Sequence, residues 1–196
     1  MAEADRRKWD ARYASGNFLI EEGAPSAILV RHMGAARRGR AMDVAAGMGR
    51  NALYLARHGF AVDALDISPV GLAHLERAAA AAGLADRVRT VVVDLEVHAP
   101  GKAIYDLVIM ANYLERRLIP RLAAALCPGG LLLIDTFLDD PASRAVAMNP
   151  AHLLKPGELG AFFGDDFEIL EERAYPRVCM DGSERLKQAF AVRRRP

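Results

Sequence analysis

Short apolar segments alternate with amphipathic ones through the first two thirds of the chain. The apolar segments are rich in branched residues, as expected of strands that are buried on both faces. The segments between them have the spacing of helices. This alternation predicts parallel strands joined by right-handed helical crossovers, a doubly wound α/β sheet. The predicted strands are 41–45, 61–66, 88–93, 105–110 and 131–137.

One crossover helix carries clear signals at both of its ends. Ser68 is a good N-cap, and Pro69 suits the first helical position because its missing N–H would have no partner there. The alanine-rich run that follows stops at Gly83, a residue that tolerates the left-handed conformation just past a helix. The sequence therefore predicts a helix between the second and third strands.

The last third of the chain has a different pattern. The sequence predicts a turn at 128–130, a loop through Asp139-Asp-Pro141 and Asn149-Pro150, and a short helix near 156–163. Two further strands are predicted at 167–175 and 186–192, joined by a hairpin loop over 177–184 that contains Asp181-Gly182. The first 34 residues precede the first strand and predict one or two helices with a loop at Ser15-Gly-Asn17.

Composition and charge narrow the class of protein. A chain of 196 residues with 52% hydrophobic residues predicts one domain with a substantial core. The formal net charge of +1 gives no reason to expect nucleic acid or an anionic membrane as a partner. No apolar run has the roughly 18 residues that span a bilayer, and the polar N-terminus does not resemble a signal peptide. Cys127 and Cys179 fit no metal-ligand spacing, so we expect free thiols in a cytoplasmic protein.

The turn after the first strand suits a ligand that carries a positive charge. It reads Asp43-Val-Ala-Ala-Gly-Met-Gly-Arg50, with two glycines where the dinucleotide fingerprint has three. Glycines let a backbone approach a ligand closely. Asp43 lies late in the strand, where its carboxylate would repel a pyrophosphate and attract an ammonium. The turn therefore predicts a ligand that has an amine and no phosphate at this position.

Acidic residues also end the next two strands. Asp66 closes the second strand, at the position where an acid accepts hydrogen bonds from ribose hydroxyls in doubly wound folds. Asp94 follows the third strand, where its carboxylate could reach an adenine amino group while Leu95 packs on the ring. Three acids at successive strand ends predict a nucleoside site. The competing interpretation is that each acid only caps a nearby loop N–H.

These motifs together resemble those of class I S-adenosylmethionine-dependent methyltransferases. The chain is also similar to the small bacterial tellurite-resistance and thiopurine-type enzymes of that class. Its one departure is Ala45, where glycine is common, and we expect alanine there to take a negative φ. The residues that carry the resemblance are Asp43-Val-Ala-Ala-Gly-Met-Gly49, Leu65-Asp66-Ile-Ser-Pro69, Asp94-Leu-Glu96, Tyr105-Asp-Leu-Val-Ile-Met-Ala-Asn112, Leu126-Cys-Pro-Gly-Gly-Leu-Leu-Leu133, Trp9-Asp-Ala-Arg-Tyr13, Gly49-Arg-Asn-Ala-Leu-Tyr-Leu55 and Asn149-Pro-Ala-His-Leu-Leu-Lys-Pro-Gly-Glu158.

The resemblance implies a fold and a cofactor. The implied fold is a Rossmann-like, seven-stranded, mostly parallel sheet with an antiparallel C-terminal strand and helices on both faces. Residues 1–196 would form one methyltransferase domain, with 1–34 as an N-terminal helical lid and 35–196 as the core. The cofactor would be S-adenosyl-L-methionine, and the residues expected to bind it are Trp9, Arg12, Tyr13, Asp43, Ala45, Gly47, Gly49, Arg50, Asn51, Asp66, Ile67, Asp94, Leu95, Met110 and Asn112.

The resemblance leaves the acceptor and the catalytic groups open. Asn112 and Tyr113 lie where an acceptor would meet the methyl group. Arg116, Arg117, Arg144 and His152 would line an acceptor pocket or simply face solvent. We name no catalytic base and no metal ligand, and we expect a small-molecule acceptor with a sulfur, selenium, tellurium, nitrogen or oxygen nucleophile. The alternatives are a non-catalytic S-adenosylmethionine-binding sensor or partner protein and, less in keeping with the turn, an NAD-dependent oxidoreductase.

Overall fold

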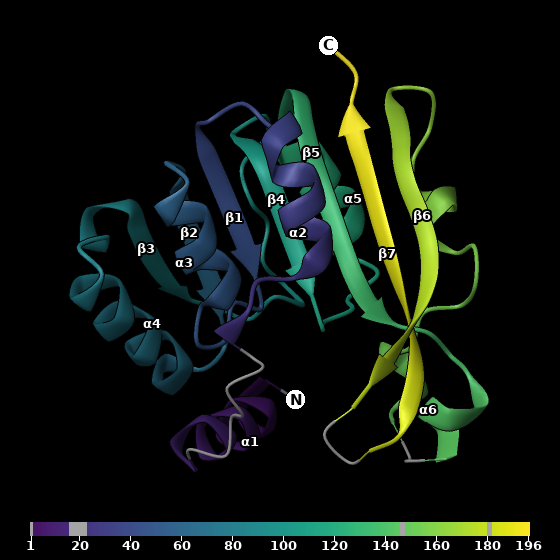
Figure 1. Ribbon diagram of the computed structural model, residues 1–196, viewed down its shortest axis with the longest axis horizontal. Helices are drawn as coiled ribbons and strands as arrows, with labels where there is room; N and C mark the ends of the chain where they lie inside the picture. Colours follow the sequence, from purple (N-terminus) through teal and green to yellow (C-terminus); the bar gives the residue numbers. More distant parts are fainter. Residues whose placement is uncertain (1, 16–22, 146–147, 180–181) are drawn as a thin grey trace.

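Seven strands form one sheet in the order β3-β2-β1-β4-β5-β7-β6 (Figure 1). The computed structural model describes residues 2–15, 23–145, 148–179 and 182–196. The predicted loop at Ser15-Gly-Asn17 and the predicted hairpin tip at Asp181-Gly182 lie partly outside these residues. The strands are β1 (Arg40–Val44), β2 (Ala61–Asp66), β3 (Val88–Val92), β4 (Tyr105–Ala111), β5 (Leu126–Phe137), β6 (Phe167–Val178) and β7 (Glu184–Arg194).

The directions of the strands confirm the predicted sheet. β1 pairs in parallel with β2 and β4, and the parallel pairs β2–β3 and β4–β5 extend the sheet on either side. β7 runs antiparallel to both β5 and β6. The order reverses between β1 and β4, which is the switch point at which doubly wound sheets bind ligands.

The start of β5 differs from the predicted boundary. The strand begins at Leu126, five residues before the predicted start at Leu131. The predicted turn at 128–130 lies within β5, where the pairing with β4 shifts register. Gly129 has a φ of 79°, so the irregular backbone expected of a turn is present as a distortion of the strand.

The helices follow most of the predicted signals. The Ser68 side chain accepts from the N–H of Gly71 at the start of α4, and Gly83 takes a φ of 68° just beyond its end. Pro141 begins a short helix instead of a loop. The helix predicted near 156–163 is reduced to one 3₁₀ turn. The helices are α1 (Ala2–Ala14), α2 (Ala27–His32), η2 (Met33–Ala35), α3 (Arg50–Arg57), α4 (Pro69–Ala81), η3 (Ala85–Arg87), α5 (Ile119–Ala125), α6 (Pro141–Ala145), η4 (Pro150–His152) and η5 (Leu159–Phe162).

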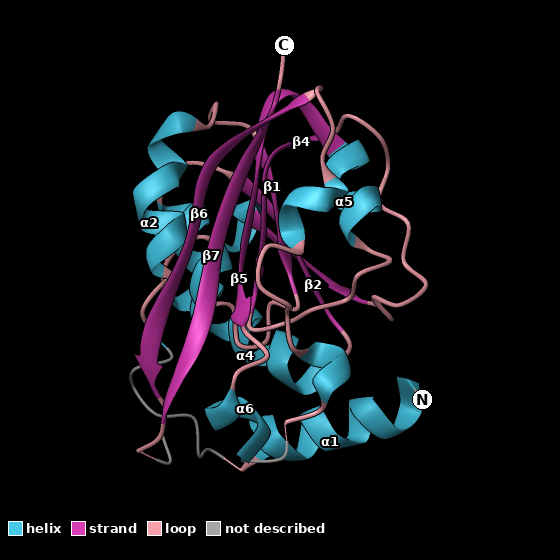
Figure 2. Ribbon diagram, turned by 90° about the vertical axis from the view of Figure 1, so that its right-hand side faces the viewer, coloured by secondary structure: helices cyan, strands magenta, loops and turns pink. Residues whose placement is uncertain are grey.

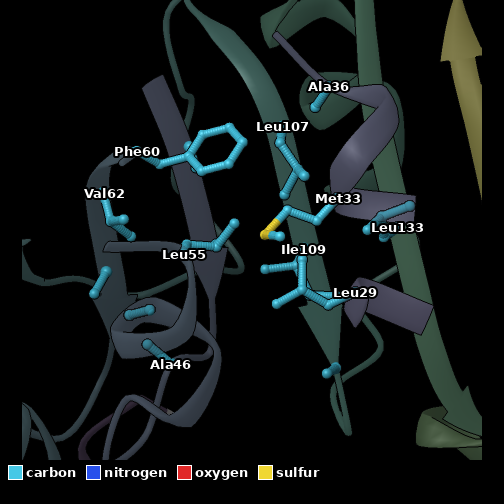
Figure 3. Close-up of a cluster of buried hydrophobic side chains, with 14 of the residues drawn as sticks. Leu29, Met33, Ala36, Ala46, Leu55, Phe60, Val62, Leu107, Ile109 and Leu133 are labelled. Atoms are coloured by element: carbon cyan, nitrogen blue, oxygen red, sulfur yellow. The ribbon is translucent and has the colours of Figure 1, made fainter. Parts of the chain in front are cut away.

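Two hydrophobic clusters cover the two faces of the sheet. On one face, α2, α3 and α4 pack against alternate residues of β1, β2, β4 and β5. Figure 3 shows Leu29 and Met33 reaching toward Leu55 and Ile109 in this cluster. On the other face, α5 and the segment around η5 pack against the remaining strand residues. Figure 2 shows α2 and α5 on opposite sides of the sheet.

The N-terminal helices have different places in the fold. α2 contributes fully buried Ile28 and Leu29 to the core, so this part of the predicted 1–34 lid is core structure. Among the described residues of this segment, α1 is the part that lies beyond the carboxyl ends of the parallel strands (Figure 1).

Candidate functional site

The loop between β1 and α3 has an unusual backbone. Ala45, Gly47 and Gly49 have φ values of 56°, 55° and 85°. The expectation of a negative φ at Ala45 is therefore wrong, and an L-residue holds a left-handed conformation that costs roughly 1–2 kcal/mol. The Ala46 N–H donates to the carbonyl of Leu65, which ties this strained loop to the end of β2.

Asp43 is a buried carboxyl beneath this loop. It is 1% exposed, and its Oδ2 accepts from the N–H of Ala52 at 3.0 Å. Burial raises the pKa of Asp43 from 3.8 to about 7, against the opposing effects of the Arg50 charge and hydrogen bonds from Ala52 and Asn51. A nearby cationic ligand would favour the ionised form of this group.

Asp66 joins two loops of the site. Its Oδ2 accepts from the N–H of Gly47 and its Oδ1 from the N–H of Ser68, both at 2.8 Å. The side chain is 4% exposed, and burial raises its pKa although these hydrogen bonds act in the opposite direction. Ile67, the next residue, is half-buried at the start of the loop to α4.

Asp94 lies in a polar loop, whereas the neighbouring Leu95 lies in the hydrophobic core. Asp94 is half-buried, and its Oδ1 accepts from the N–H of Glu96 at 2.9 Å. Leu95 is 5% exposed and belongs to the hydrophobic cluster on the α5 face. Asp66 and Asp94 thus accept from loop N–H groups, as the competing interpretation expected, whereas Asp43 accepts from an N–H in the first turn of α3. A carboxylate has about four lone-pair positions, so this role leaves each acid able to accept from a ligand.

Helix α1 packs against the same loops. The Tyr13 side chain fits where Gly47 and Gly71 lack one: a Cβ at Gly47 would lie 2.7 Å from the Tyr13 hydroxyl oxygen, and one at Gly71 would lie 2.9 Å from its ring. Trp9 stacks on Tyr13 with ring centroids 5.7 Å apart. The Ser68 hydroxyl donates to Asp10 Oδ1 at 2.5 Å.

The third predicted residue of α1 completes an aromatic and cationic face. The Arg12 guanidinium lies 5.2 Å from the centroid of the Trp9 ring. The structure therefore brings Trp9, Arg12 and Tyr13 together on one face of α1, and Tyr13 of this face lies against the glycine loop.

Arg50 and Asn51 begin α3 and contact the segment before α2. Asn51 is 3% exposed, and its Oδ1 accepts from the N–H of Ser26 at 2.8 Å. Arg50 is half-buried and donates to the Ser26 hydroxyl at 3.3 Å and to the carbonyl of Ala24 at 3.5 Å. Asn51 is thus part of the scaffold, whereas Arg50 supplies a positive charge beside Asp43.

The end of β4 brings together a buried polar network that sequence reasoning missed. Lys187 Nζ lies 2.9 Å from Asp135 Oδ1 and donates to Asn112 Oδ1 at 2.8 Å. The Tyr175 hydroxyl donates to Asp135 Oδ1 at 2.7 Å. Met110, by contrast, is fully buried, so its side chain belongs to the core.

A signal for this network was present in the sequence. Lys187 lies within the last predicted strand, 186–192. A charged residue in a buried strand needs a partner. Lys187 and Asp135 are 4% and 3% exposed. Their pairing joins β5 to β7, a long-range contact that local patterns do not specify.

The other candidates for an acceptor pocket are engaged elsewhere. Arg116 binds Glu158 and the carbonyls of Ala151 and Leu153, and so holds the segment before η5 against the loop after β4. Arg144 pairs with Asp139 at 2.6 Å on an exposed part of the chain. The other two candidates, Arg117 and His152, are both exposed. Tyr113 is half-buried, and burial raises its pKa.

Two hollows, of about 500 and 350 Å³, lie at the opposite end of the sheet, where the strands begin. The larger is lined by residues that include Arg37, Asp106 and Gly129, and the smaller by residues that include Arg40 and Arg89. These residues precede or begin the strands, whereas doubly wound sheets bind ligands where the strands end. We therefore place the candidate site at the glycine loop.

The described residues, 2–15, 23–145, 148–179 and 182–196, contain neither a metal cluster nor a membrane-spanning helix. Among those residues, no group of three histidines, cysteines or acids is placed to hold a metal ion. No described helix is long and apolar enough to cross a membrane. Cys127 and Cys179 are free and half-buried.

Comparisons with known proteins bear on the family and the fold. Residues 41–130 match the model of a family described as a methyltransferase domain. A search of curated proteins found no match. A solved S-adenosylmethionine-dependent methyltransferase from Methanosarcina mazei has a TM-score of 0.71 at 19% identity, over 88% of this chain and 99% of that one.

Two other solved structures have similar scores. TehB from Haemophilus influenzae has a TM-score of 0.70 at 20% identity, over 86% of this chain and 61% of that one. The 1,6-didemethyltoxoflavin-N1-methyltransferase of Burkholderia thailandensis has a TM-score of 0.70 at 23% identity, over 100% of this chain and 89% of that one. The chain thus has the fold of the S-adenosylmethionine-dependent methyltransferases, and its residues 41–130 match the model of a methyltransferase domain.

Proposed function

We propose that this protein transfers a methyl group from S-adenosylmethionine to a small-molecule acceptor. The observation that carries the proposal is the pair Asp43 and Asp66, two buried acids that meet one glycine loop at the switch point of the sheet. The match of residues 41–130 to a methyltransferase domain supports it independently.

The glycine loop fits the methionyl part of such a cofactor. Asp43 is buried and its pKa is raised, so an ammonium group near it would stabilise the carboxylate. Gly47 and Gly49 give the loop its left-handed turns, with Tyr13 and Leu75 packed where their side chains would be. Arg50, at the start of α3, is the residue proposed to bind the methionyl carboxylate, which suits a bidentate guanidinium contact.

The nucleoside part would extend toward β2 and β3. We assign Asp66 to the ribose hydroxyls and Asp94 with Leu95 to the adenine, in the order in which the strands lie in the sheet. Trp9, Arg12 and Tyr13 of α1 are proposed to cover the cofactor, because Tyr13 lies beside Gly47 and Gly71, Trp9 stacks on Tyr13, and Arg12 lies over Trp9.

The cofactor supplies an activated methyl group on a sulfonium, which is a good leaving group. The chain would hold the two reactants in line and exclude water from them. A soft nucleophile needs no strong base, and we assign no catalytic base to the chain. The formal net charge of +1 also favours a small acceptor over a nucleic acid.

Methyl transfer is tested with tritiated S-adenosylmethionine and a panel of thiols, amines and chalcogen oxyanions. The proposal predicts that label passes to at least one acceptor class and that Asp43→Asn reduces this transfer. Tight cofactor binding without transfer to any member of the panel would instead favour a non-catalytic S-adenosylmethionine-binding protein.

A further inference from the structure

The smaller hollow, of about 350 Å³, lies where β2 and β3 begin, at the end of the sheet opposite α1 (Figure 1). Its volume is within the range of sites that hold small ligands. Three arginines line it: Arg40 on β1, Arg89 on β3, and Arg87 at the end of η3. All three are exposed, so the hollow opens to solvent between positive charges.

A buried carboxylate holds two of these arginines in place. Asp63 of β2 is 4% exposed, and it accepts from Arg89 Nε and from a terminal nitrogen of Arg40, both at 2.7 Å. The Tyr105 hydroxyl also donates to Asp63, at 2.8 Å. Burial opposes the ionisation of Asp63, but these hydrogen bonds outweigh it and lower its pKa. The carboxylate therefore stays charged and orients both guanidinium groups.

The contacts with Asp63 leave hydrogen-bond donors for a ligand. A guanidinium has five N–H groups in a planar fork that matches a phosphate group. Asp63 binds one nitrogen of Arg40 and one of Arg89, which leaves the other nitrogens of each fork without an acceptor among the described residues. Arg87 donates to the carbonyl of Gly59 at 3.3 Å, a neutral partner that does not balance its charge.

The charges of the lining do not cancel. Two arginines share the single charge of Asp63, and Arg87 adds a third positive charge. Asp86, an exposed residue of the lining, opposes them only in part. The hollow thus keeps a surplus positive charge, although the formal net charge of the whole chain is only +1.

Further arginines lie at the same corner of the sheet. The Arg38 guanidinium lies 5.2 Å from the centroid of the Phe60 ring, next to the start of β2. Arg57 is exposed at the end of α3, just before Gly59. Because exposed charges of one sign raise the local concentration of ions of the other, this corner should attract anions.

We propose that the smaller hollow binds a small phosphate-bearing anion through the guanidinium forks of Arg40, Arg87 and Arg89. A phosphate group suits it better than a carboxylate, because its larger charge and three oxygens can use the forks of more than one arginine. The site lies at the opposite end of the sheet from the glycine loop, so it goes beyond the proposed methyl transfer and does not depend on it.

Inorganic pyrophosphate is the probe for this site, with acetate as the matched weak anion. Each is titrated by calorimetry into the full-length protein at constant ionic strength, with no cofactor added. We expect one pyrophosphate per chain with a dissociation constant below about 1 mM. Acetate should bind at least about tenfold more weakly. Higher salt should weaken the binding of pyrophosphate, because it screens exposed charges.

Variants assign the binding to the hollow. Arg87→Gln removes a positive charge without leaving an acid unpaired, and should weaken pyrophosphate binding about fivefold. Arg77→Gln is the control, because Arg77 is also exposed and donates to a backbone carbonyl, that of Ala73, but lies on α4 outside the lining. Arg89→Lys keeps a charge beside Asp63 and removes the fork, so it should also weaken binding.

Asp86→Asn supplies a test in the opposite direction. It removes the carboxylate that opposes an anion, so it should strengthen pyrophosphate binding about two- to threefold. Urea denaturation shows that each variant is folded. Unchanged or weaker binding in folded Asp86→Asn would contradict the electrostatic basis of the site.

Two further results would overturn the inference. One is a folded wild type that does not bind pyrophosphate, or that loses as much affinity in Arg77→Gln as in Arg87→Gln. The other is tighter binding of a single-stranded DNA oligonucleotide than of pyrophosphate, lost in Arg87→Gln, which would assign the arginines to a nucleic acid. Neither result depends on S-adenosylhomocysteine, so the proposed function is tested separately.

Discussion

The backbone N–H of Gly47 donates to Oδ2 of Asp66 at 2.8 Å and so links the loop after β1 to the end of β2. The other oxygen of the same carboxylate accepts from Ser68, the N-cap of α4. One side chain thus fixes two of the loops that would surround a cofactor. This arrangement lets the loop geometry exist before any ligand binds.

Asp66→Ala should weaken S-adenosylhomocysteine binding by about 1–3 kcal/mol, because ribose hydroxyls and two loop N–H groups would lose their acceptor. Calorimetric titration gives the affinity, and thermal unfolding shows whether the variant is folded. A folded variant with the affinity of the wild type would remove Asp66 from the binding site and leave it only its role in the loops.

Cofactor binding should release a proton from Asp43. Burial raises its pKa to about 7, so at about pH 6 the free protein holds this carboxyl mostly protonated. A ligand ammonium favours the ionised form, so affinity should increase as the pH rises through 7. Titrations in two buffers of different ionisation enthalpy measure the released proton directly, and Asp43→Asn should show none.

Ionisation of Asp43 should have the opposite effect on folding stability, which should fall as the pH rises. A raised pKa means that ionisation favours the unfolded state, so stability present below pH 3.8 is lost as the pH rises through about 7. This shift corresponds to about 4 kcal/mol for a fully buried carboxyl. Asp43→Asn should therefore unfold at a higher urea concentration than the wild type at alkaline pH. Equal urea midpoints for the variant and the wild type at alkaline pH would show that ionisation of Asp43 does not destabilise the fold.

Gly49 should tolerate a side chain less well than Gly59. Both have a positive φ, 85° and 91°, which costs alanine roughly 1–2 kcal/mol. A Cβ at Gly49 would also lie 2.2 Å from Leu75 Cδ1, whereas one at Gly59 would have no atom within 4 Å. Urea denaturation should show a larger loss for Gly49→Ala, and equal losses would contradict the packing of α4 on the loop.

Acid should weaken the contact between β6 and α2. Burial opposes ionisation of Glu171, but hydrogen bonds from Arg31 and His32 outweigh it and lower its pKa from 4.5 to about 2. The stability from this group is present above pH 4.5 and is lost as the pH falls toward 2. Because Arg31 is partly exposed and solvent screens the pair, the size of this contribution is about 1 kcal/mol.

Glu171→Gln should lack this component of the acid transition, which unfolding free energies measured between neutral and acidic pH would show. Glu168→Gln is the control, because Glu168 is more exposed and lies 3.8 Å from Arg193. If both variants followed the wild-type pH dependence, the pairing with Arg31 and His32 would not stabilise the fold.

Local patterns predicted the strands and the cap of α4 because buried strands and caps depend on neighbouring residues. They also placed Asp43 and Asp66 at the ends of two neighbouring strands, whereas the position of α1 was implied only by the resemblance. The φ of Ala45 could not be predicted, because the long-range bond from Ala46 to Leu65 holds that backbone.

Longer-range contacts explain what the patterns missed. Lys187 and Asp135 lie in strands that become neighbours only when β7 inserts between β5 and β6. Arg116 was a candidate for a pocket, but its partners are backbone and side-chain groups some 35 to 42 positions further along the chain. Tertiary structure decides such pairings.

Calorimetric titration of the folded, ligand-free protein with S-adenosylhomocysteine, with NAD titrated in parallel, tests the proposed cofactor most directly. We expect micromolar binding of S-adenosylhomocysteine and no binding of NAD, because Asp43 faces the loop where a pyrophosphate would lie. Binding of NAD alone, or of neither compound, would contradict the proposed cofactor and leave only the fold.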